Sequence, residues 1–304
     1  MNLFSKTIFN DEEAKGWLPW GVLATILALV ITIALLAGTN SLILKPLELV
    51  DDKWEPIGAY GFFAFLTVSF GAVGLAFLGW IKLVERRSLA SVGLSTPGGM
   101  KTFWQGHGAG IAMMAVIVTL IGVFGGYEVG AVAPALSSPT ALFQIALLLI
   151  GFALQSSVEE FIFRGWLLSV LTRKFNLLAA VLVSSALFTF MHFSPENAWY
   201  NSLNIMAFSF FACAWVIKTG NIWGVMGWHA GWNWFTATGF EVPVTGLDTD
   251  TSALVVQLSP TGPDWLHGAG MGPEGSLFCT LVLVAGTLFW LTRPTNQDVT
   301  AKAS

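Results

Sequence analysis

Long apolar runs separated by short polar stretches extend along the chain from residue 17 to residue 292. A helix needs about 20 apolar residues to cross the hydrocarbon core of a bilayer, and eight runs approach or exceed that length. The pattern therefore predicts about eight transmembrane helices. They cover residues 17–42, 57–81, 106–126, 141–171, 177–193, 198–217, 222–240 and 276–291.

The composition agrees with a membrane protein, since hydrophobic residues make up 55% of the chain and charged residues only 11%. Soluble domains usually carry about 25% charged residues. No polar linker divides the apolar runs, and the first run is interpreted as a retained helix because a cleaved signal has a different layout. We predict an all-α, polytopic integral membrane protein with a tail over residues 1–16, one membrane domain over residues 17–292 and a tail over residues 293–304.

Lys and Arg residues are unevenly distributed among the loops. By the positive-inside rule, this asymmetry places both tails in the cytoplasm of a multi-pass protein of the cell membrane. The later outside loops carry acidic residues and no Lys or Arg, and the longest of them, residues 241–275, is expected to be partly irregular. It is either a lid or a solvated connector. The predicted cytoplasmic cations are Lys6, Lys15, Lys82, Arg86, Arg87, Lys101, Arg173, Lys174, Lys218, Arg293 and Lys302.

Three charged residues, Glu159, Glu160 and Arg164, stand inside the fourth apolar run. Each costs about 2.5–3.5 kcal/mol on insertion scales, so such residues are candidates for function, although a structural ion pair is the alternative. Glu160 and Arg164 are four residues apart and share one face of a helix. Glu159 lies about 100° away around the helix. We therefore predict that Arg164 pairs with Glu160 and leaves Glu159 free to act as a general base.

Two histidines also lie in apolar runs. His192 follows Phe188 by one turn, and His229 shares a helical face with Asn233. A single membrane histidine is often a packing residue, but two of them with an asparagine and two carboxylates indicate a site. His192 and Glu159 lie equally far from the turn between their helices. Bringing His229 to the same depth requires the fourth and fifth helices to project about two turns into the cytoplasm.

These residue types allow water to add to an amide carbonyl. Glu159 would take the proton, His192 would share the water, and His229 with Asn233 would donate hydrogen bonds to the oxyanion. No cofactor is then required. The alternative is a zinc ion held by Glu159, His192 and His229 with one open position, although the sequence has no HExxH motif.

The motifs Glu159-Glu160-xxx-Arg164, Phe188-xxx-His192 and His229-xxx-Asn233 resemble the EExxxR, FxxxH and HxxxN motifs of the CPBP intramembrane proteases. This family is also called the CAAX protease and bacteriocin-processing, or Abi, family. The resemblance spans about residues 140–240, the expected catalytic core. It implies a glutamate-dependent endopeptidase with its site in a membrane cavity. Eukaryotic members of this family remove the last three residues of prenylated CAAX proteins.

The expected partners are membrane lipid and a peptide or lipidated-protein substrate, with no nucleic acid. A non-catalytic chaperone or bacteriocin-immunity protein would keep the same fold, although intact motifs argue against it. A proton-coupled transporter also uses membrane Glu and His residues, but it would be expected to show paired repeats and broken helices in both halves. The sequence shows neither.

Overall fold

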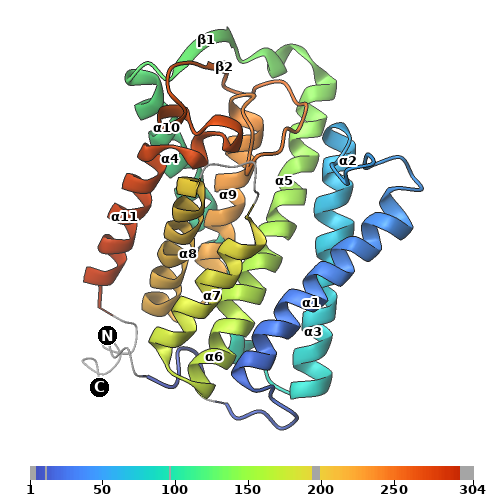
Figure 1. Cartoon of the computed structure of the whole chain (residues 1–304), viewed down its shortest axis with the longest axis vertical. Coiled ribbons are helices and arrows are strands. Elements are labelled where there is room, and N and C mark those ends of the chain that lie inside the picture. Colours follow the sequence, from blue (N-terminus) through green and yellow to red (C-terminus); the bar gives the residue numbers. More distant parts are fainter. Residues whose placement is uncertain (1–4, 11, 96, 194–198, 295–304) are drawn as a thin grey trace.

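The computed structural model describes residues 5–10, 12–95, 97–193 and 199–294. The chain forms a bundle of helices with a small two-stranded sheet at one end (Figure 1). A helical segment stands at each of the eight predicted runs, so the mostly helical fold is confirmed. The segments are α1 (Gly21–Thr39) with η1 (Asn40–Leu44); α2 (Gly58–Ala64), η2 (Phe65–Ser69), α3 (Phe70–Gly79) and η3 (Trp80–Glu85); α4 (Gly99–Val123); α5 (Pro139–Glu160), η6 (Phe161–Leu167) and α6 (Leu168–Lys174); α7 (Leu177–Met191); α8 (Trp199–Thr219); α9 (Trp223–Gly239); and α11 (Leu277–Thr292).

Five of these helical segments are long and apolar enough to cross a membrane, by length and composition. The other three, α7, α9 and α11, have 15, 17 and 16 residues. A membrane-spanning architecture is therefore confirmed for the described part of the chain, but the number of eight spans is not. The five are Gly21–Leu44, Gly58–Glu85, Gly99–Val123, Pro139–Lys174 and Trp199–Thr219.

Polar residues at the turns begin several of the helices. Ser138 accepts a hydrogen bond from the backbone N–H of Ala141 and caps α5, which also has a proline at its first position. Asn176 caps α7 and Ser276 caps α11 in the same way. These side chains satisfy backbone donors that a helix leaves unpaired at its start. They also fix the point at which the chain turns back between α6 and α7.

The predicted outside segments contain strands, which the all-α prediction did not include. β1 (Tyr127–Val132) pairs antiparallel with β2 (Val256–Pro260) and joins the α4–α5 connection to the 241–275 loop. Strands of five or six residues are too short to be recognised among apolar runs of membrane length. The loop also contains α10 (Asp264–His267), and many of its residues are buried, including Val242, Val244 and Met271. It therefore packs against the helices, unlike a fully solvated connector.

Close backbone contact joins α4 to α9 through small residues. A β-carbon at Gly106 would lie 2.0 Å from the carbonyl oxygen of Gly224, and one at Gly110 would lie 2.1 Å from that of Trp228. From the other side, a β-carbon at Gly227 would lie 1.8 Å from the oxygen of Phe103. Glycines spaced four apart let membrane helices approach this closely. The position of α9 in the bundle is therefore set by contact with α4.

The helices that carry the candidate residues differ greatly in length. The continuous helix from α5 through α6 has 36 residues, which corresponds to about 54 Å. His192 lies sixteen residues after Asn176, whereas His229 lies six residues after Trp223, the first residue of α9. The two histidines meet at one site, so the difference of ten residues measures how far the α6–α7 turn extends past the start of α9. At 1.5 Å per residue, this distance is about 15 Å. This offset is somewhat larger than the two turns that the sequence required.

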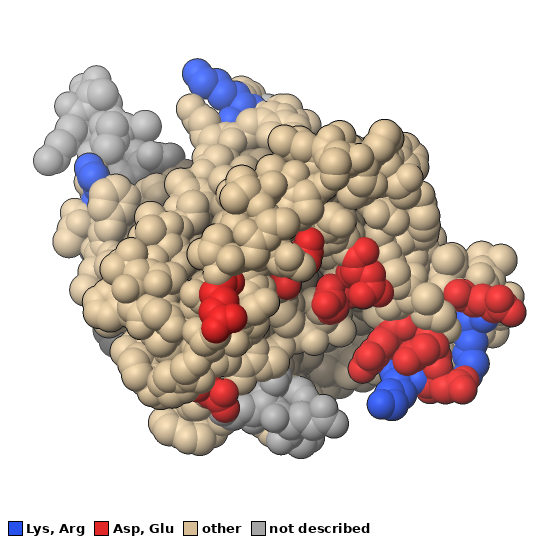
Figure 2. All heavy atoms as spheres, turned by 90° about the horizontal axis from the view of Figure 1, so that it is seen from above, with Lys and Arg blue, Asp and Glu red and all other residues tan. Residues whose placement is uncertain are grey.

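The two ends of the bundle differ in charge. The first described residues, the α6–α7 turn and the last turn of α11 lie at one end, and the β1–β2 sheet lies at the other (Figure 1). Viewed from the sheet end, Asp and Glu side chains lie in the middle of the face and at its right margin, and Lys and Arg side chains lie only near the margins (Figure 2). The arrangement agrees with the charge pattern of the loops. That the opposite end faces the cytoplasm stays a prediction.

Candidate active site

Glu159 lies on α5 immediately before the helix changes its winding. The next residues, from Phe161 to Leu167, form a π-helical segment inside the long helix. Such segments often occur at functional sites. The carboxylate of Glu159 is 8% exposed, and its Oε2 accepts no hydrogen bond from any described residue. Glu159 is thus a buried carboxylate with an acceptor available to a substrate or a water molecule.

Glu160 forms the ion pair that its spacing predicts. Its Oε1 lies 3.2 Å from Nη1 of Arg164, and neither side chain is exposed. The same oxygen lies 2.9 Å from Nδ1 of His229. Because a carboxylate accepts hydrogen bonds, Nδ1 of His229 carries the hydrogen and Nε2 points the other way. Glu160 therefore links Arg164 to the histidine of α9, a contact that spacing along one helix does not predict.

His192 is held at the C-terminal end of α7. Its Nδ1 lies 2.9 Å from the backbone oxygen of Phe188 and donates to it, so Nε2 faces the site. The two rings also contact each other, with centroids 4.3 Å apart. The ring of Phe188 also contacts Arg164, whose guanidinium lies 4.2 Å from the ring centroid. Phe188 thus packs between the buried ion pair and His192.

The two imidazoles converge on Glu159. Nε2 of His192 lies 4.0 Å from Oε1, and Nε2 of His229 lies 3.8 Å from Oε2. These separations are too long for direct hydrogen bonds, but suit groups that share a small molecule between them. The structure therefore brings Glu159, Glu160, Arg164, His192 and His229 together from three helices.

Asn233 completes the set, one turn after His229 on α9. Its Nδ2 lies 3.3 Å from Oε1 of Gln155 and 3.4 Å from Oγ of Ser156, and donates towards both. Ser156 in turn donates to Oε1 of Gln155 over 3.0 Å. The asparagine is 5% exposed, and it is bound to α5 by these contacts. All six residues predicted for the site therefore lie together.

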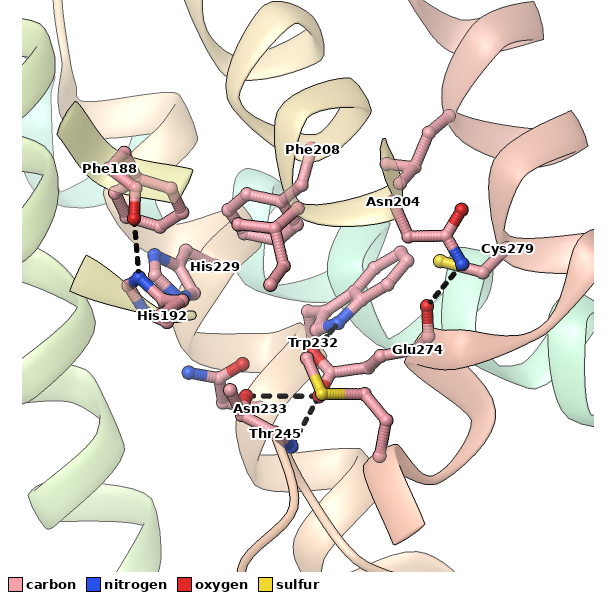
Figure 3. Close-up of a pocket in the computed structure, with 13 residues that line it drawn as sticks. Phe188, His192, Asn204, Phe208, His229, Trp232, Asn233, Thr245, Glu274 and Cys279 are labelled. Carbon is pink, nitrogen blue, oxygen red and sulfur yellow. Dashed lines mark hydrogen bonds between the residues drawn. The ribbon is translucent and has the colours of Figure 1, made fainter. Parts of the chain in front are cut away.

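A cavity of about 260 Å³ opens beside Glu159. Its polar residues come mostly from α5, α7 and α9, and its apolar residues come from α1, the α2–α3 region, the α5–η6 helix, α7 and the 241–275 loop. A second, smaller pocket reaches His192, His229 and Asn233 from the side of α8 and α11 (Figure 3). The lining of the large cavity includes Gln155, Glu159, His192, His229, Asn233, Thr32, Leu36, Phe62, Phe65, Phe70, Val244, Thr245 and Leu247.

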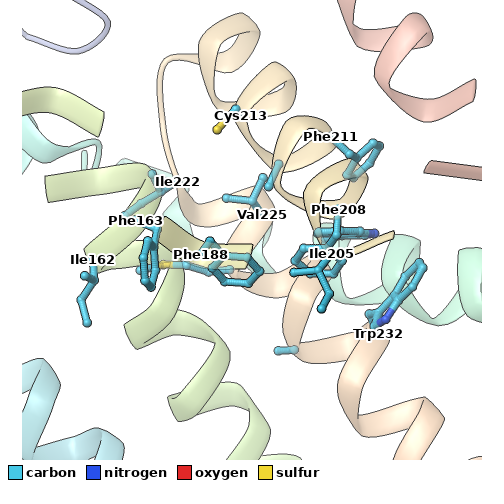
Figure 4. Close-up of a cluster of buried hydrophobic side chains, with 14 of the residues drawn as sticks. Ile162, Phe163, Phe188, Ile205, Phe208, Phe211, Cys213, Ile222, Val225 and Trp232 are labelled. Carbon is cyan, nitrogen blue, oxygen red and sulfur yellow. The ribbon is translucent and has the colours of Figure 1, made fainter. Parts of the chain in front are cut away.

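Aromatic side chains from η6, α7, α8 and α9 pack beside the site. The rings of Phe188 and Phe208 are parallel with centroids 5.9 Å apart, and Phe163 meets Phe188 edge to face at 5.1 Å (Figure 4). Phe208 also contacts the ring of His229 at 4.8 Å and that of Trp232 at 5.8 Å. Close packing of this kind limits water around the ion pair and strengthens its electrostatic interactions.

Comparison with known families gives one match. Residues 141–235 match the family model described as type II CAAX prenyl endopeptidase Rce1-like. The chain contains an Rce1-like domain. The resemblance seen in the three motifs is thereby confirmed, and the family that the model describes is a protease family. No curated protein and no solved structure matches the chain at the threshold applied.

The Rce1-like domain begins with α5 and ends within α9, so it contains all six predicted site residues. α1, the α2–α3 region and the 241–275 loop, which supply part of the apolar wall of the cavity, lie outside the match. A deep cavity lined by a carboxylate, two imidazoles and an amide has the composition of a hydrolytic site.

The residues fit a zinc ion poorly. Two tetrahedral ligands about 2.0–2.1 Å from zinc lie about 3.3 Å from each other, whereas both Nε2–carboxylate separations here are 3.8–4.0 Å. Across residues 5–294, apart from the short undescribed segments, no three His, Cys, Asp or Glu side chains form a group that could hold a metal. The independence of activity from metal stays a prediction.

Sequence reasoning missed three polar residues at the site because it considered only ionisable groups at membrane depth. Gln155 and Ser156 are uncharged, and Glu274 lies in a loop that was expected to be outside. Glu274 is 9% exposed, and its carboxylate accepts hydrogen bonds from Nε1 of Trp232 at 2.7 Å and from Oγ1 of Thr245 at 3.0 Å (Figure 3). The run Gln155-Ser156-Ser157 in an apolar helix was the available signal.

Proposed function

We propose that this protein is an intramembrane endopeptidase in which Glu159 activates water for attack on a peptide bond. The observation that carries the proposal is the convergence of two imidazole Nε2 atoms on one buried carboxylate inside a cavity. The Rce1-like domain supports the peptidase class. A membrane-associated peptide, including one with a lipidated CAAX-type end, is the substrate class that we infer.

The proposed reaction begins with a water molecule between Glu159 and His192. Because Nδ1 of His192 donates to the backbone oxygen of Phe188, its Nε2 accepts one hydrogen of this water. Glu159 takes the second hydrogen as a proton while the water oxygen bonds to the carbonyl carbon. The proton then passes from Glu159 to the leaving amine as the carbon–nitrogen bond breaks.

Asn233 and His229 stabilise the oxyanion in this scheme. Donation from Nε2 of His229 requires the ring to carry both hydrogens, and the carboxylate of Glu160, 2.9 Å from Nδ1, is placed to balance that charge. Arg164 holds Glu160 in place through the buried ion pair. Donors fixed in a site with little water act strongly on the charge that develops in the transition state.

The proposal is tested by cleavage assays on the purified protein in lipid, using one CAAX peptide with and without its prenyl group. Glu159→Gln should abolish cleavage and leave a folded protein, because the amide keeps the shape of the carboxylate but cannot take the proton. Glu128→Gln makes the same change on the exposed strand β1 and should cleave at the wild-type rate. A Glu159→Gln protein that cleaves at the wild-type rate would exclude Glu159 as the base.

A second experiment tests metal dependence. Asn233→Ala should lower kcat by roughly 100- to 1000-fold, the usual loss for one oxyanion donor, with little change in substrate binding. Chelators should leave the purified wild-type protein active. One tightly bound zinc per chain by elemental analysis, with activity restored only by added zinc, would contradict this mechanism and leave the peptidase class intact.

A further inference from the structure

Gln155 is a polar residue of the cavity that the proposed reaction does not use. It lies one turn before Glu159 on α5 and is 7% exposed. Like Glu159, His229 and Asn233, it lines the large cavity. A polar side chain at membrane depth is costly, so it is a candidate for a function. Its contacts with Asn233 and Ser156 indicate what it does.

Three distances define how these side chains meet. Nδ2 of Asn233 lies 3.3 Å from Oε1 of Gln155 and 3.4 Å from Oγ of Ser156, and those two oxygens lie 3.0 Å apart. By the cosine rule, the angle between the two acceptors at Nδ2 is about 53°. The two hydrogens of a planar amide nitrogen diverge by about 120°. One N–H of Asn233 therefore points between both acceptors, and the other N–H diverges from it by about 120°.

The contacts also determine which way the amide of Asn233 faces. Oε1 of Gln155 can only accept hydrogen bonds, and the hydroxyl of Ser156 already donates to it. If the amide of Asn233 were reversed, its oxygen would face the oxygen of Gln155. In the orientation that the structure shows, the nitrogen of Asn233 faces the acceptor on Gln155, and its second hydrogen is left for another acceptor.

We propose that Gln155 is a positioning residue that fixes the amide of Asn233 as an oxyanion donor. The proposal rests on the peptidase function above and adds a residue to it. Gln155 acts through Asn233 and does not itself stabilise the oxyanion. It follows that the effect of changing Gln155 depends on the acceptor oxygen, and disappears when Asn233 is absent.

Substitutions at Gln155 separate these roles. Gln155→Met removes the acceptor at nearly constant volume and should lower kcat by roughly 10- to 100-fold, part of the loss expected for the donor itself, at unchanged KM. Gln155→Glu keeps an acceptor and loses the amide donor, so it should retain kcat within a few fold on the plateau of the pH profile. A Gln155→Glu variant as impaired as Gln155→Met would overturn the proposal.

Two further comparisons complete the kinetic test. In the Asn233→Ala background, Gln155→Met should cause no additional loss, because residues that act as a unit are not additive. An undiminished loss in that background would show that Gln155 acts independently and would refute the positioning role. Gln144→Met makes the same change eleven residues earlier on α5, at a position outside both cavities, and should keep the wild-type kcat.

A measurement without substrate distinguishes this proposal from the peptidase function. In protein labelled with ¹⁵N-asparagine in detergent micelles, the side-chain amide of Asn233 is identified by its loss in Asn233→Ala. Hydrogen exchange of that amide should be at least about tenfold faster in Gln155→Met than in wild type or Gln155→Glu. Equal exchange rates in all three proteins would overturn the proposal. An inactive wild type with this exchange pattern would instead refute only the peptidase function.

Discussion

Replacing Gly231 by alanine tests whether contact between α4 and α9 sets the geometry of the site. A β-carbon at this position would lie 2.1 Å from the carbonyl oxygen of His107, where ordinary contact begins at 3.4 Å. The backbones of the two helices must therefore separate by about 1.3 Å at this point. The obstacle is backbone, so a side-chain rotation cannot relieve it.

The separation would disturb both stability and the site. Overpacking a close contact costs about 1–3 kcal/mol. His229 lies two residues before Gly231, and its Nδ1 is 2.9 Å from Glu160. Moving α9 by more than 1 Å would stretch this hydrogen bond beyond its useful range. A misplacement of about 1 Å can reduce turnover about 100-fold, so we expect Gly231→Ala to be both less stable and much less active.

The assay combines thermal unfolding in detergent with peptide cleavage. The control is Gly108→Ala on α4, where a β-carbon would meet nothing within 4 Å. This variant should be as stable as wild type or slightly more so, because alanine favours a helix by about 1 kcal/mol over glycine. If Gly231→Ala had the wild-type unfolding temperature and kcat, the argument that α4 positions α9 would be wrong.

Three further predictions follow from the buried charges and the topology. Arg164→Ala should destabilise the fold by about 3–5 kcal/mol, measured by thermal unfolding, because it leaves a buried carboxylate without its partner; a fully stable variant would contradict this. Glu274→Ala should loosen the 241–275 loop and increase its cleavage by added protease, because it removes the carboxylate that accepts hydrogen bonds from Trp232 on α9 and Thr245 in the loop. An unchanged digestion pattern would refute this role of Glu274. A cysteine introduced at the exposed Asp250 should react with an impermeant reagent added outside intact cells, and one at Glu13 should not; the reverse labelling would invert the topology.

Much of the helical architecture follows from the sequence because lipid imposes simple rules. Each helix must satisfy its own backbone groups, so apolar run length predicts helix position. The starts of α5, α7 and α8 fall within two residues of the predicted ones. The length of apolar runs does not predict short strands. β1 and β2 form only by pairing across more than a hundred residues, and nothing in either strand alone indicates its partner.

The site was predictable to the extent that it depends on spacing along one helix. The pair Glu160–Arg164 follows from four-residue spacing, and the isolation of Glu159 follows from its angle around the helix. Contacts between helices do not follow from such rules. The hydrogen bond from His229 to Glu160 and the one from Asn233 to Gln155 depend on the rotation of α9 against α5. That rotation is determined by packing of α9 on both α4 and α5.

The cavity is assembled from two sources along the chain. The groups proposed for the reaction all lie within the segment that matches the protease family, whereas Phe62, Phe65 and Phe70 on one wall and Thr245 and Leu247 on another lie outside it. The residues proposed for the chemistry thus lie in the matched segment, whereas part of the cavity wall is encoded on either side of it. Exchanging these wall segments between related proteins, or varying their positions in a library, would show whether they set the cleavage preference of the proposed peptidase.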